Sequence, residues 1–131
     1  MRALLDTGAW LWFTGSSDRL GPRTRELLQE PTNDLYLSLV SVWEVAIKAA
    51  KGKIEGIGDP SVFVRTRLRR QQVSPLGISL DHVLAVASLP QHHGDPFDRL
   101  LIAQAQAESL TIVTSDRQIA QYAVTVHDAS T

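Results

Sequence analysis

Four acidic side chains occupy positions from which distant parts of the chain could build one site. Asp6 and Asp116 each follow a short apolar run that is typical of a buried strand, and Glu44 and Asp98 lie in the first turns of two expected helices. In an open parallel sheet, ligands bind beyond the carboxyl ends of the strands, where the following helices begin. We therefore expect these four carboxylates to meet at one edge of a sheet.

Such a cluster predicts a bound divalent cation. Gathered carboxylates raise one another's pKa values, so a fold would not hold them together without a positive charge among them. Oxygen donors in a chain without cysteine favour Mg²⁺ or Mn²⁺ over Zn²⁺. One or two such ions can activate water and neutralise the charge of a phosphodiester during in-line displacement. Phosphodiester hydrolysis is therefore the chemistry that fits these residues.

Each acid also has a structural interpretation, which spacing alone leaves open. The run Ser41–Glu44 fits a capping box, in which the glutamate only closes the start of a helix. The run Asp95–Asp98 puts one acid at an N-cap, a proline next and a second acid in the first turn, and Asp95 is interpreted mainly as a cap. Ser115-Asp116 resembles another cap. Asp6 is harder to explain in this way, because a carboxylate that ends an apolar strand needs partners.

Short apolar runs alternate with helical patterns along the whole chain. This order predicts an α/β protein, a three-layer α/β/α sandwich with a parallel five-stranded sheet. The unbroken apolarity of the first and fourth strands fits a sheet covered on both faces. The expected strands are Ala3–Leu5, Leu35–Leu39, Leu76–Ile78, Leu110–Thr114 and Ala123–Val126. The expected helices are Trp10–Phe13, Arg23–Glu30, Ser41–Ala50, Asp59–Gln72 (with Val62, Phe63 and Leu68 on its inner face), Leu80–Ser88, Asp95–Glu108 and Asp116–Gln121.

The composition is that of an ordinary folded protein, with 44% hydrophobic and 21% charged residues among 131. This length fits one domain, which we place at residues 1–131. The absence of cysteine excludes disulfides, thiolate metal sites and cysteine nucleophiles. The net charge of −1 excludes a polycation that binds nucleic acid by charge alone. The first apolar run stops at Asp6, too early for a signal peptide, and no run is long enough to span a bilayer, so we expect a soluble, cytoplasmic protein.

Four blocks of sequence carry a family resemblance. They are Leu4–Thr7 with Trp10-Leu11-Trp12, then Ser41–Lys48, Asp95–Ala105 and Ile112–Asp116. Together these blocks resemble the PIN-domain family, and most closely its VapC-type toxins from bacterial toxin–antitoxin pairs. They occur in the family's order, and the block that begins at Asp95 is the most distinctive.

The resemblance implies a Mg²⁺- or Mn²⁺-dependent endoribonuclease on a five-stranded parallel sheet, which leaves 5′-phosphate and 3′-hydroxyl ends. By position, Asp6, Glu44, Asp98 and Asp116 match the acidic catalytic and metal-binding set of the family. Family members commonly form homodimers. They are held inactive by a cognate VapB-type antitoxin, whose C-terminal segment wraps the toxin and can block the acidic pocket.

Neighbouring positions partly follow the family pattern. Thr7 and Thr114 match small polar positions beside the acids, and Asp95 lies close to them. Gly8 stands where many relatives carry a larger polar residue. His92-His93 replaces a histidine followed by a basic or polar residue. We expect both histidines to be solvated rather than metal ligands, because a hard cation does not prefer imidazole.

A basic segment could hold RNA phosphates beside the acids. From Lys48 to Arg70 there are seven basic residues against two acidic ones, and we single out Lys48, Lys51 and Lys53 as RNA contacts. An equally good interpretation is that residues 65–70 form the solvated face of one helix. Arg99 is a further candidate, which could contact phosphate or pair with a neighbouring acid.

Other functions fit the sequence less well. A phosphatase of the haloacid-dehalogenase type needs a second aspartate where Gly8 stands, and the chain has neither a P-loop nor the glycine fingerprint of a dinucleotide fold. Another metal-dependent phosphoesterase and a non-catalytic PIN-fold interaction module are the alternatives, although such a module has less reason to keep four acids. Trp10, Trp12 and Trp43 could stack on bases, but their spacing is more typical of core or interface residues.

Overall fold

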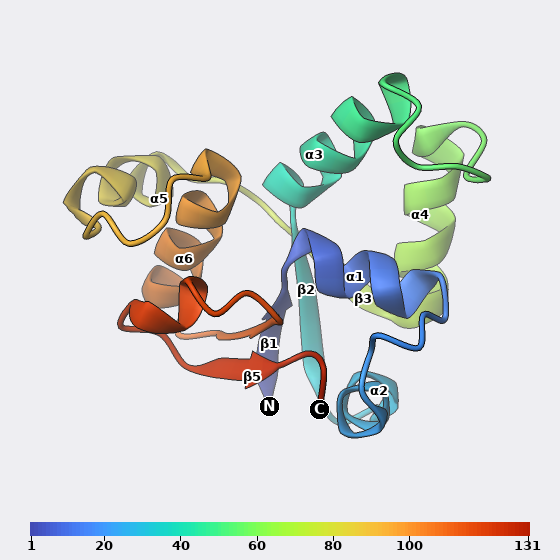
Figure 1. The fold of residues 1–131 in the computed structure, drawn as a ribbon, viewed down its shortest axis with the longest axis horizontal. Helices are drawn as coiled ribbons and strands as arrows, with labels where there is room; N and C mark the ends of the chain where they lie inside the picture. Colours follow the sequence, from blue (N-terminus) through green and yellow to red (C-terminus); the bar gives the residue numbers. More distant parts are fainter.

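The computed structural model describes residues 1–131 and contains a five-stranded sheet in which all neighbouring strands are parallel. Helices α5 and α6 cover one face, and α1, α2 and α4 cover the other, which confirms the expected three-layer α/β/α fold (Figure 1). The strands, in spatial order, are β3 (Val73–Leu76), β2 (Asp34–Ser38), β1 (Arg2–Leu5), β4 (Thr111–Thr114) and β5 (Val126–Asp128). The helices are α1 (Thr7–Thr14), α2 (Pro22–Gln29), α3 (Leu39–Ala50), α4 (Pro60–Gln71), α5 (Leu80–Ala85) and α6 (Pro96–Glu108), with short 3-10 turns η1 (Val86–Ser88) and η2 (Ile119–Gln121). No helix has both the length and the apolar character needed to cross a membrane.

The central strand β1 is buried on both of its faces. Ala3 and Leu5 pack into the hydrophobic cluster that contains Trp10, whereas Leu4 packs into the cluster on the opposite side with Ile102. Successive side chains of a strand point to opposite faces, so a doubly covered strand needs an unbroken apolar run. This requirement explains why β1 could be predicted from the sequence.

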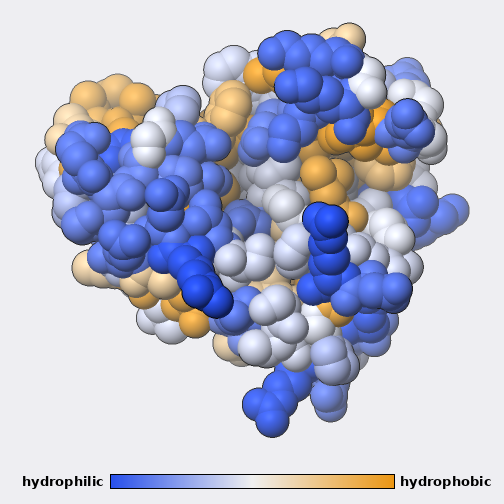
Figure 2. Space-filling model, in the orientation of Figure 1, coloured by the Kyte–Doolittle hydropathy of each residue, from blue (hydrophilic) through white to orange (hydrophobic).

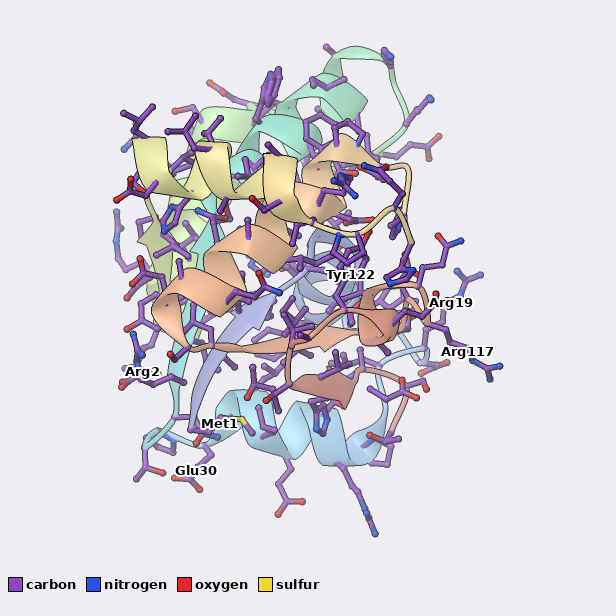
Figure 3. The ribbon with its side chains drawn as sticks, turned by 90° about the vertical axis from the view of Figure 1, so that its left-hand side faces the viewer. Met1, Arg2, Arg19, Glu30, Arg117 and Tyr122 are labelled. Atoms are coloured by element: carbon purple, nitrogen blue, oxygen red, sulfur yellow. The ribbon has the colours of Figure 1, made fainter.

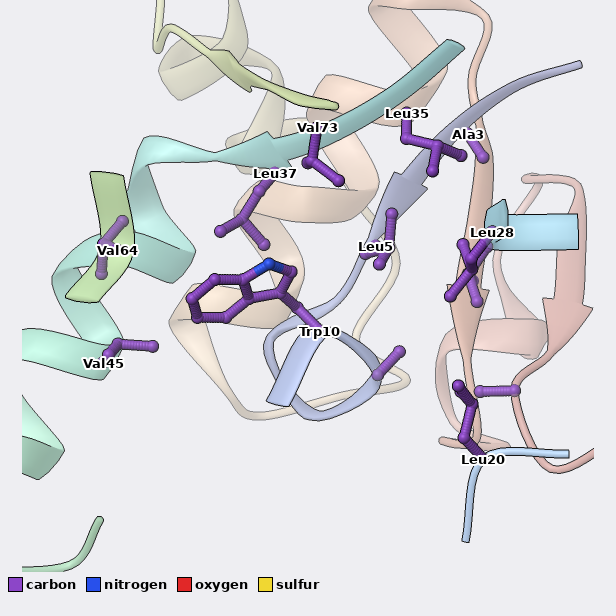
Figure 4. Close-up of a cluster of buried hydrophobic side chains, with 13 residues drawn as sticks. Ala3, Leu5, Trp10, Leu20, Leu28, Leu35, Leu37, Val45, Val64 and Val73 are labelled. Carbon is purple, nitrogen blue, oxygen red and sulfur yellow. The ribbon is translucent and has the colours of Figure 1, made fainter. Parts of the chain in front are cut away.

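Trp10 lies at the centre of the core on the α1 side of the sheet (Figure 4). Its ring is fully buried and meets Phe63 edge to face, with 6.1 Å between centroids. Its indole N–H donates to Gln71 Oε1 at 2.8 Å, so burial leaves no polar group without a partner. Trp12 packs against the same cluster, but the side chain of Trp43 is 60% exposed. Trp10 is therefore a core residue, Trp12 is partly buried against the core, and Trp43 is exposed.

Two strands lie away from their expected positions. Strand β3 begins at Val73, three residues before the expected start, because Gln72 closes α4 in the left-handed conformation and the chain enters the sheet at once. β3 contains Pro75, which is tolerated because β3 is an edge strand. Strand β5 occupies Val126–Asp128 rather than Ala123–Val126. The two edge strands therefore lie at other sequence positions than predicted, whereas the central strands lie where they were expected.

Two helices also correct the sequence analysis. Helix α3 begins at Leu39, with Ser38 as its N-cap, so Glu44 lies in the second turn and the expected capping box is absent. In α4 the buried residue is Val64, whereas Val62 is 63% exposed. Phe63 and Leu68 pack against the core as predicted, so the expected inner face of α4 is confirmed except at Val62, whose place is taken by Val64.

Candidate metal centre

The two central strands end side by side at the edge where the strand order reverses. The chain continues from β1 toward β2 and β3 on one side and reaches β4 and β5 on the other. Asp6 follows β1 directly, and its backbone N–H donates to the Val113 carbonyl of β4 at 3.0 Å. This position is the crevice where open α/β sheets bind ligands.

The Asp6 carboxylate is buried and held by two donors. Oδ1 accepts the backbone N–H of Ala9 at 2.7 Å, which makes Asp6 the N-cap of α1. Oδ2 accepts the hydroxyl of Thr114, the last residue of β4. The same hydroxyl accepts the backbone N–H of Asp116 at 3.0 Å. Thr114 therefore connects two acids that are far apart in the sequence, which supports the polar role expected at this position.

Asp95 and Asp98 have different tasks at the start of α6. Asp95 Oδ1 accepts the backbone N–H groups of Phe97 at 2.8 Å and of Asp98 at 3.3 Å, so Asp95 is the helix cap. The Asp98 carboxylate takes no part in this cap. It lies instead with the Asp116 carboxylate around His93, and the nearby charges of Asp95, Asp6 and Asp116 raise its pKa.

Helix α3 brings the fourth acid to the same region. Glu44 is mostly buried, with 15% of its side chain exposed, and its Oε2 lies 3.1 Å from the Lys48 ammonium one turn later. Its charge acts on Asp6, whose pKa it raises. The hydroxyl of Thr7 in α1 donates to the buried Ser41 hydroxyl at 2.9 Å and joins α1 to α3. Ser41 thus connects helices and does not cap α3.

His93 lies between two of the acids, contrary to the expectation that it would be solvated. Its Nε2 is 2.8 Å from Asp116 Oδ2 and 3.1 Å from Asp98 Oδ2, and only 10% of its side chain is exposed. These three side chains place donor atoms within 4.8 Å of one another, a spacing that could hold a metal ion. The ring of His92 is exposed, as expected, and packs edge to face on Tyr122.

Burial and mutual repulsion raise the pKa values of two acids. Burial raises the pKa of Asp6 above its ordinary value, against the hydrogen bonds from Thr114 and Ala9. The pKa of Asp98 is raised to about 7, first by burial and then by neighbouring acids, while His93 acts in the opposite direction. Two carboxyl groups that resist ionisation in one crevice are what a cation would stabilise.

Two residues hold the loop beside this crevice. The sequence analysis assigned a different role to Arg99 and did not single out Tyr122. Tyr122 lies beside the loop that precedes α6 (Figure 3) and its hydroxyl accepts the backbone N–H groups of His92 at 3.1 Å and His93 at 2.9 Å. Arg99 is buried and donates to the Pro90 carbonyl at 2.8 Å, the Val86 carbonyl at 3.1 Å and the Tyr122 hydroxyl at 3.2 Å. Arg99 is therefore a structural residue that organises the loop, and its predicted contact with RNA or an acid is wrong.

The basic residues do not form one continuous patch around the acids. Lys48 is paired with Glu44. Lys51 and Lys53 are exposed after the end of α3 that points away from the sheet (Figure 1). Arg67 lies over the Phe63 ring, 5.4 Å from its centroid. Only Lys48 thus lies next to a candidate ligand.

The donor set fits a divalent cation bound by oxygen. Asp6, Asp98 and Asp116 are joined through Thr114 and His93, and Glu44 is near enough to act on Asp6 electrostatically. The tight group of three excludes Asp6 and Glu44, so the four predicted acids share a crevice without being equally close. Hard cations such as Mg²⁺ and Mn²⁺ prefer such carboxylates.

The parallel three-layer fold, with carboxylates at its topological switch point, places the chain in the class of open α/β domains that bind ligands at this edge of the sheet (Figure 1). Within this class, the model of the PIN domain matches residues 3–124, and the chain belongs to the PIN domain family. A curated relative, Ribonuclease VapC16 of Mycobacterium tuberculosis (strain ATCC 25618 / H37Rv), is 39% identical over 59 residues. This match covers 45% of the chain and 40% of that relative's length.

Solved structures share the fold over nearly the whole chain. VapBC2 from Rickettsia felis, bound to a DNA fragment from their promoter, superposes with a TM-score of 0.73 at 17% identity and covers 97% of this chain and 98% of its own. VapBC-1 from nontypeable Haemophilus influenzae gives a TM-score of 0.66 at 17% identity, with 100% of both chains covered. A toxin–antitoxin complex from Klebsiella pneumoniae gives 0.62 at 22% identity, with 97% of both chains covered. At these identities the likeness establishes the fold.

Proposed function

We propose that this protein is a Mg²⁺- or Mn²⁺-dependent endoribonuclease, and that it acts as the toxin of a toxin–antitoxin pair. The observation that carries the proposal is the meeting of Asp6, Glu44, Asp98 and Asp116 in one crevice, with pKa values of Asp6 and Asp98 raised by burial and by neighbouring acids. Membership of the PIN domain family and the similarity to Ribonuclease VapC16 support the activity.

Asp6, Asp98 and Asp116 would hold the principal cation, and Glu44 would complete its environment or help to hold a second ion. When bound, the cation supplies an activated water and neutralises charge on the scissile phosphate. The chain itself fixes the carboxylates: the Thr114 hydroxyl donates to Asp6 and accepts the backbone N–H of Asp116, and the Asp95 cap sets the start of α6.

We expect RNA to reach these acids through a hollow of the surface. The space-filling view is hollowed between the part formed by α5 and α6 and the part formed by α3 and α4 (Figures 1 and 2). Trp43 lies on α3 next to Glu44, is 60% exposed and meets Phe97 edge to face at 5.1 Å. We expect Lys48 on α3, and Lys51 and Lys53 after its end, to add favourable charge for phosphates.

We extend the proposal to two kinds of protein partner. A VapB-type antitoxin would silence the enzyme, as the complexes of the structural neighbours suggest. A homodimer would cover apolar side chains on α5, where Leu80, Val83 and Leu84 are 73%, 50% and 60% exposed. Figure 2 shows an apolar area over the region that α5 occupies in Figure 1.

The test is cleavage of RNA by purified, antitoxin-free protein with Mg²⁺ or Mn²⁺, compared with EDTA. Removal of a group that only supports a metal ligand lowers activity by roughly 10–100-fold. We expect the Asp98→Asn and Asp6→Ala variants to lose more RNA-cleavage activity than that. Asp59→Asn is the matched control, because Asp59 only caps the remote helix α4 and asparagine caps equally well. Sequencing of the RNA ends reports the cleavage chemistry, and 5′-phosphate ends are expected.

Two results would overturn this proposal. Near-wild-type turnover by a folded Asp98→Asn variant would remove its assigned role. Intact RNA under every metal condition, together with retained binding to an antitoxin, would instead make the protein a non-catalytic interaction module.

A further inference from the structure

His93 lies where a metal ligand would be expected, but the hydrogen bonds around it indicate a different role. The ring is nearly buried, and Nε2 points at one oxygen each of Asp98 and Asp116. The inference below rests on the proposed function, because it concerns the same carboxylate centre.

The opposite side of the ring fixes its tautomer. His93 Nδ1 accepts the backbone N–H of Asp95 at 3.1 Å. A backbone N–H can only donate, so Nδ1 must present a lone pair, and the hydrogen of the neutral ring is then on Nε2. An Nε2–H group donates to carboxylates, and it offers no lone pair to a metal.

The donor to Nδ1 cannot readily move away. Asp95 caps α6 through Phe97 and Asp98, which anchors its backbone. The loop that carries His93 is held from the other side by the Tyr122 hydroxyl, which accepts the N–H of His93 at 2.9 Å. Coordination through Nε2 would require the proton to move to Nδ1, where it would face the Asp95 N–H.

A second histidine in the same chain shows this arrangement away from the acids. His82 Nδ1 accepts the backbone N–H of Ser79 at 3.1 Å, and its Nε2 lies 2.9 Å from Glu108 Oε1. There the ring closes the start of α5 and ties it to α6. A backbone donor at Nδ1 thus directs Nε2–H to a carboxylate twice in this protein.

The geometry points to His93 as a positioning residue that holds Asp98 and Asp116 together by donating from Nε2–H, and not as a ligand of the cation. One oxygen of each carboxylate is engaged in this way. The role spaces the two acids for the cation, in the way that outer hydrogen bonds orient metal ligands generally.

Substitutions of His93 distinguish a hydrogen-bond donor from a metal ligand. Glutamine places an N–H₂ group near the position of Nε2, so His93→Gln keeps a donor, whereas His93→Ala removes it. We expect His93→Ala to weaken Mn²⁺ binding, measured by calorimetry with the metal alone, by roughly 10–100-fold, and His93→Gln to restore affinity to within about threefold of the wild type. His92→Ala is the matched control, because its exposed ring lies outside the centre.

Two spectroscopic measurements test the inference without RNA cleavage. Long-range ¹⁵N–¹H correlation spectra of the metal-free protein, with His93→Gln to assign the signals, should show the Nε2–H tautomer for His93. Pulsed electron paramagnetic resonance of bound Mn²⁺ should show no directly coordinated ¹⁴N. An Nδ1–H tautomer, or a ¹⁴N coupling that His93→Gln abolishes, would overturn the inference.

These measurements also test the role of His93 independently of the proposed function. A protein with the expected tautomer and Mn²⁺ affinities that never cleaves RNA would end the nuclease proposal and leave the role of His93 intact. An enzyme that cleaves RNA and shows ¹⁴N coordination from His93 would support the proposed function and overturn the inference about His93.

Discussion

At the scale of single residues, the structure separates an acid that only caps a helix from acids that lie in the candidate metal centre. Asp95 is a cap, and Asp98 three residues later is not. Asp6 does both, because one oxygen caps α1 and the other accepts the Thr114 hydroxyl. A capping pattern in a sequence therefore does not exclude a role in a metal centre.

The raised pKa of Asp98 predicts how stability depends on pH. Its pKa is about 7 in the folded protein against the ordinary 3.8, so between these values the folded state binds more protons than the unfolded state. The free energy of unfolding of the metal-free protein should therefore fall as pH rises from about 4 to 7, by about 1.4 kcal/mol for each unit of pKa difference before solvent screening reduces it.

Urea unfolding across this pH range measures the slope. Asp98→Asn should flatten it, because asparagine does not ionise, while part of the slope persists through Asp6, whose pKa is also raised. The control Asp59→Asn should keep the wild-type slope. Equal slopes in wild type and Asp98→Asn would contradict the assigned environment of Asp98.

At the scale of elements, the loop before α6 is organised by one hydroxyl group. Tyr122 accepts hydrogen bonds from His92, His93 and Arg99, and Arg99 in turn donates to loop carbonyls. The 3-10 turn η2 ends at Tyr122's neighbour, so this residue joins the segment after β4 to the start of α6. The loop is thereby held against the acidic crevice.

Tyr122→Phe should be destabilising well beyond the loss of one ordinary hydrogen bond. It leaves three donors without their shared acceptor, and a buried group without a partner costs about 1–3 kcal/mol. Equilibrium unfolding in urea measures the loss. Tyr36→Phe is the control, because the Tyr36 ring lies in β2 beneath the Arg2 guanidinium, away from this loop. Equal stability of the two variants would show that the hydroxyl does not organise the loop.

Sequence reasoning recovered those elements whose signals are local. The apolar run of β1 and the Asp-Pro start of α6 each report directly on burial or capping. Strand β3 was misplaced because its signal, Val73-Ser74-Pro75-Leu76, contains a proline that only an edge strand accepts. The start of α3 was misplaced because Ser41 resembles a cap, although Ser38 performs that task.

The sequence predicts which acids belong to the candidate site, but it does not predict the geometry around them. Asp6, Glu44, Asp98 and Asp116 were expected at one edge from the order of strands and helices alone. The position of His93 depends on Tyr122, which is 29 residues further along the chain, so no local pattern announces it. Arg99 was misread because an arginine beside acids suggests the surface, whereas its donors satisfy carbonyls inside a loop.

At the scale of the whole molecule, a bound cation should stabilise the fold. A ligand that binds only the folded state adds about 2.7 kcal/mol when present at a hundred times its dissociation constant. Thermal unfolding monitored by calorimetry should therefore shift upward with increasing Mg²⁺ or Mn²⁺. Asp98→Asn should show a smaller shift than Asp59→Asn, and identical shifts in both variants would place the cation elsewhere.

The four acids of the crevice are drawn from positions 6, 44, 98 and 116, and strand β4, which pairs with β1, lies late in the chain. During translation, an emerging polypeptide carries its first acid long before its last. On the proposed function, each newly made molecule stays harmless to the message being read until β4 has left the ribosome and inserted beside β1. The topology thus delays activity until the strand that precedes the last of these acids has been made.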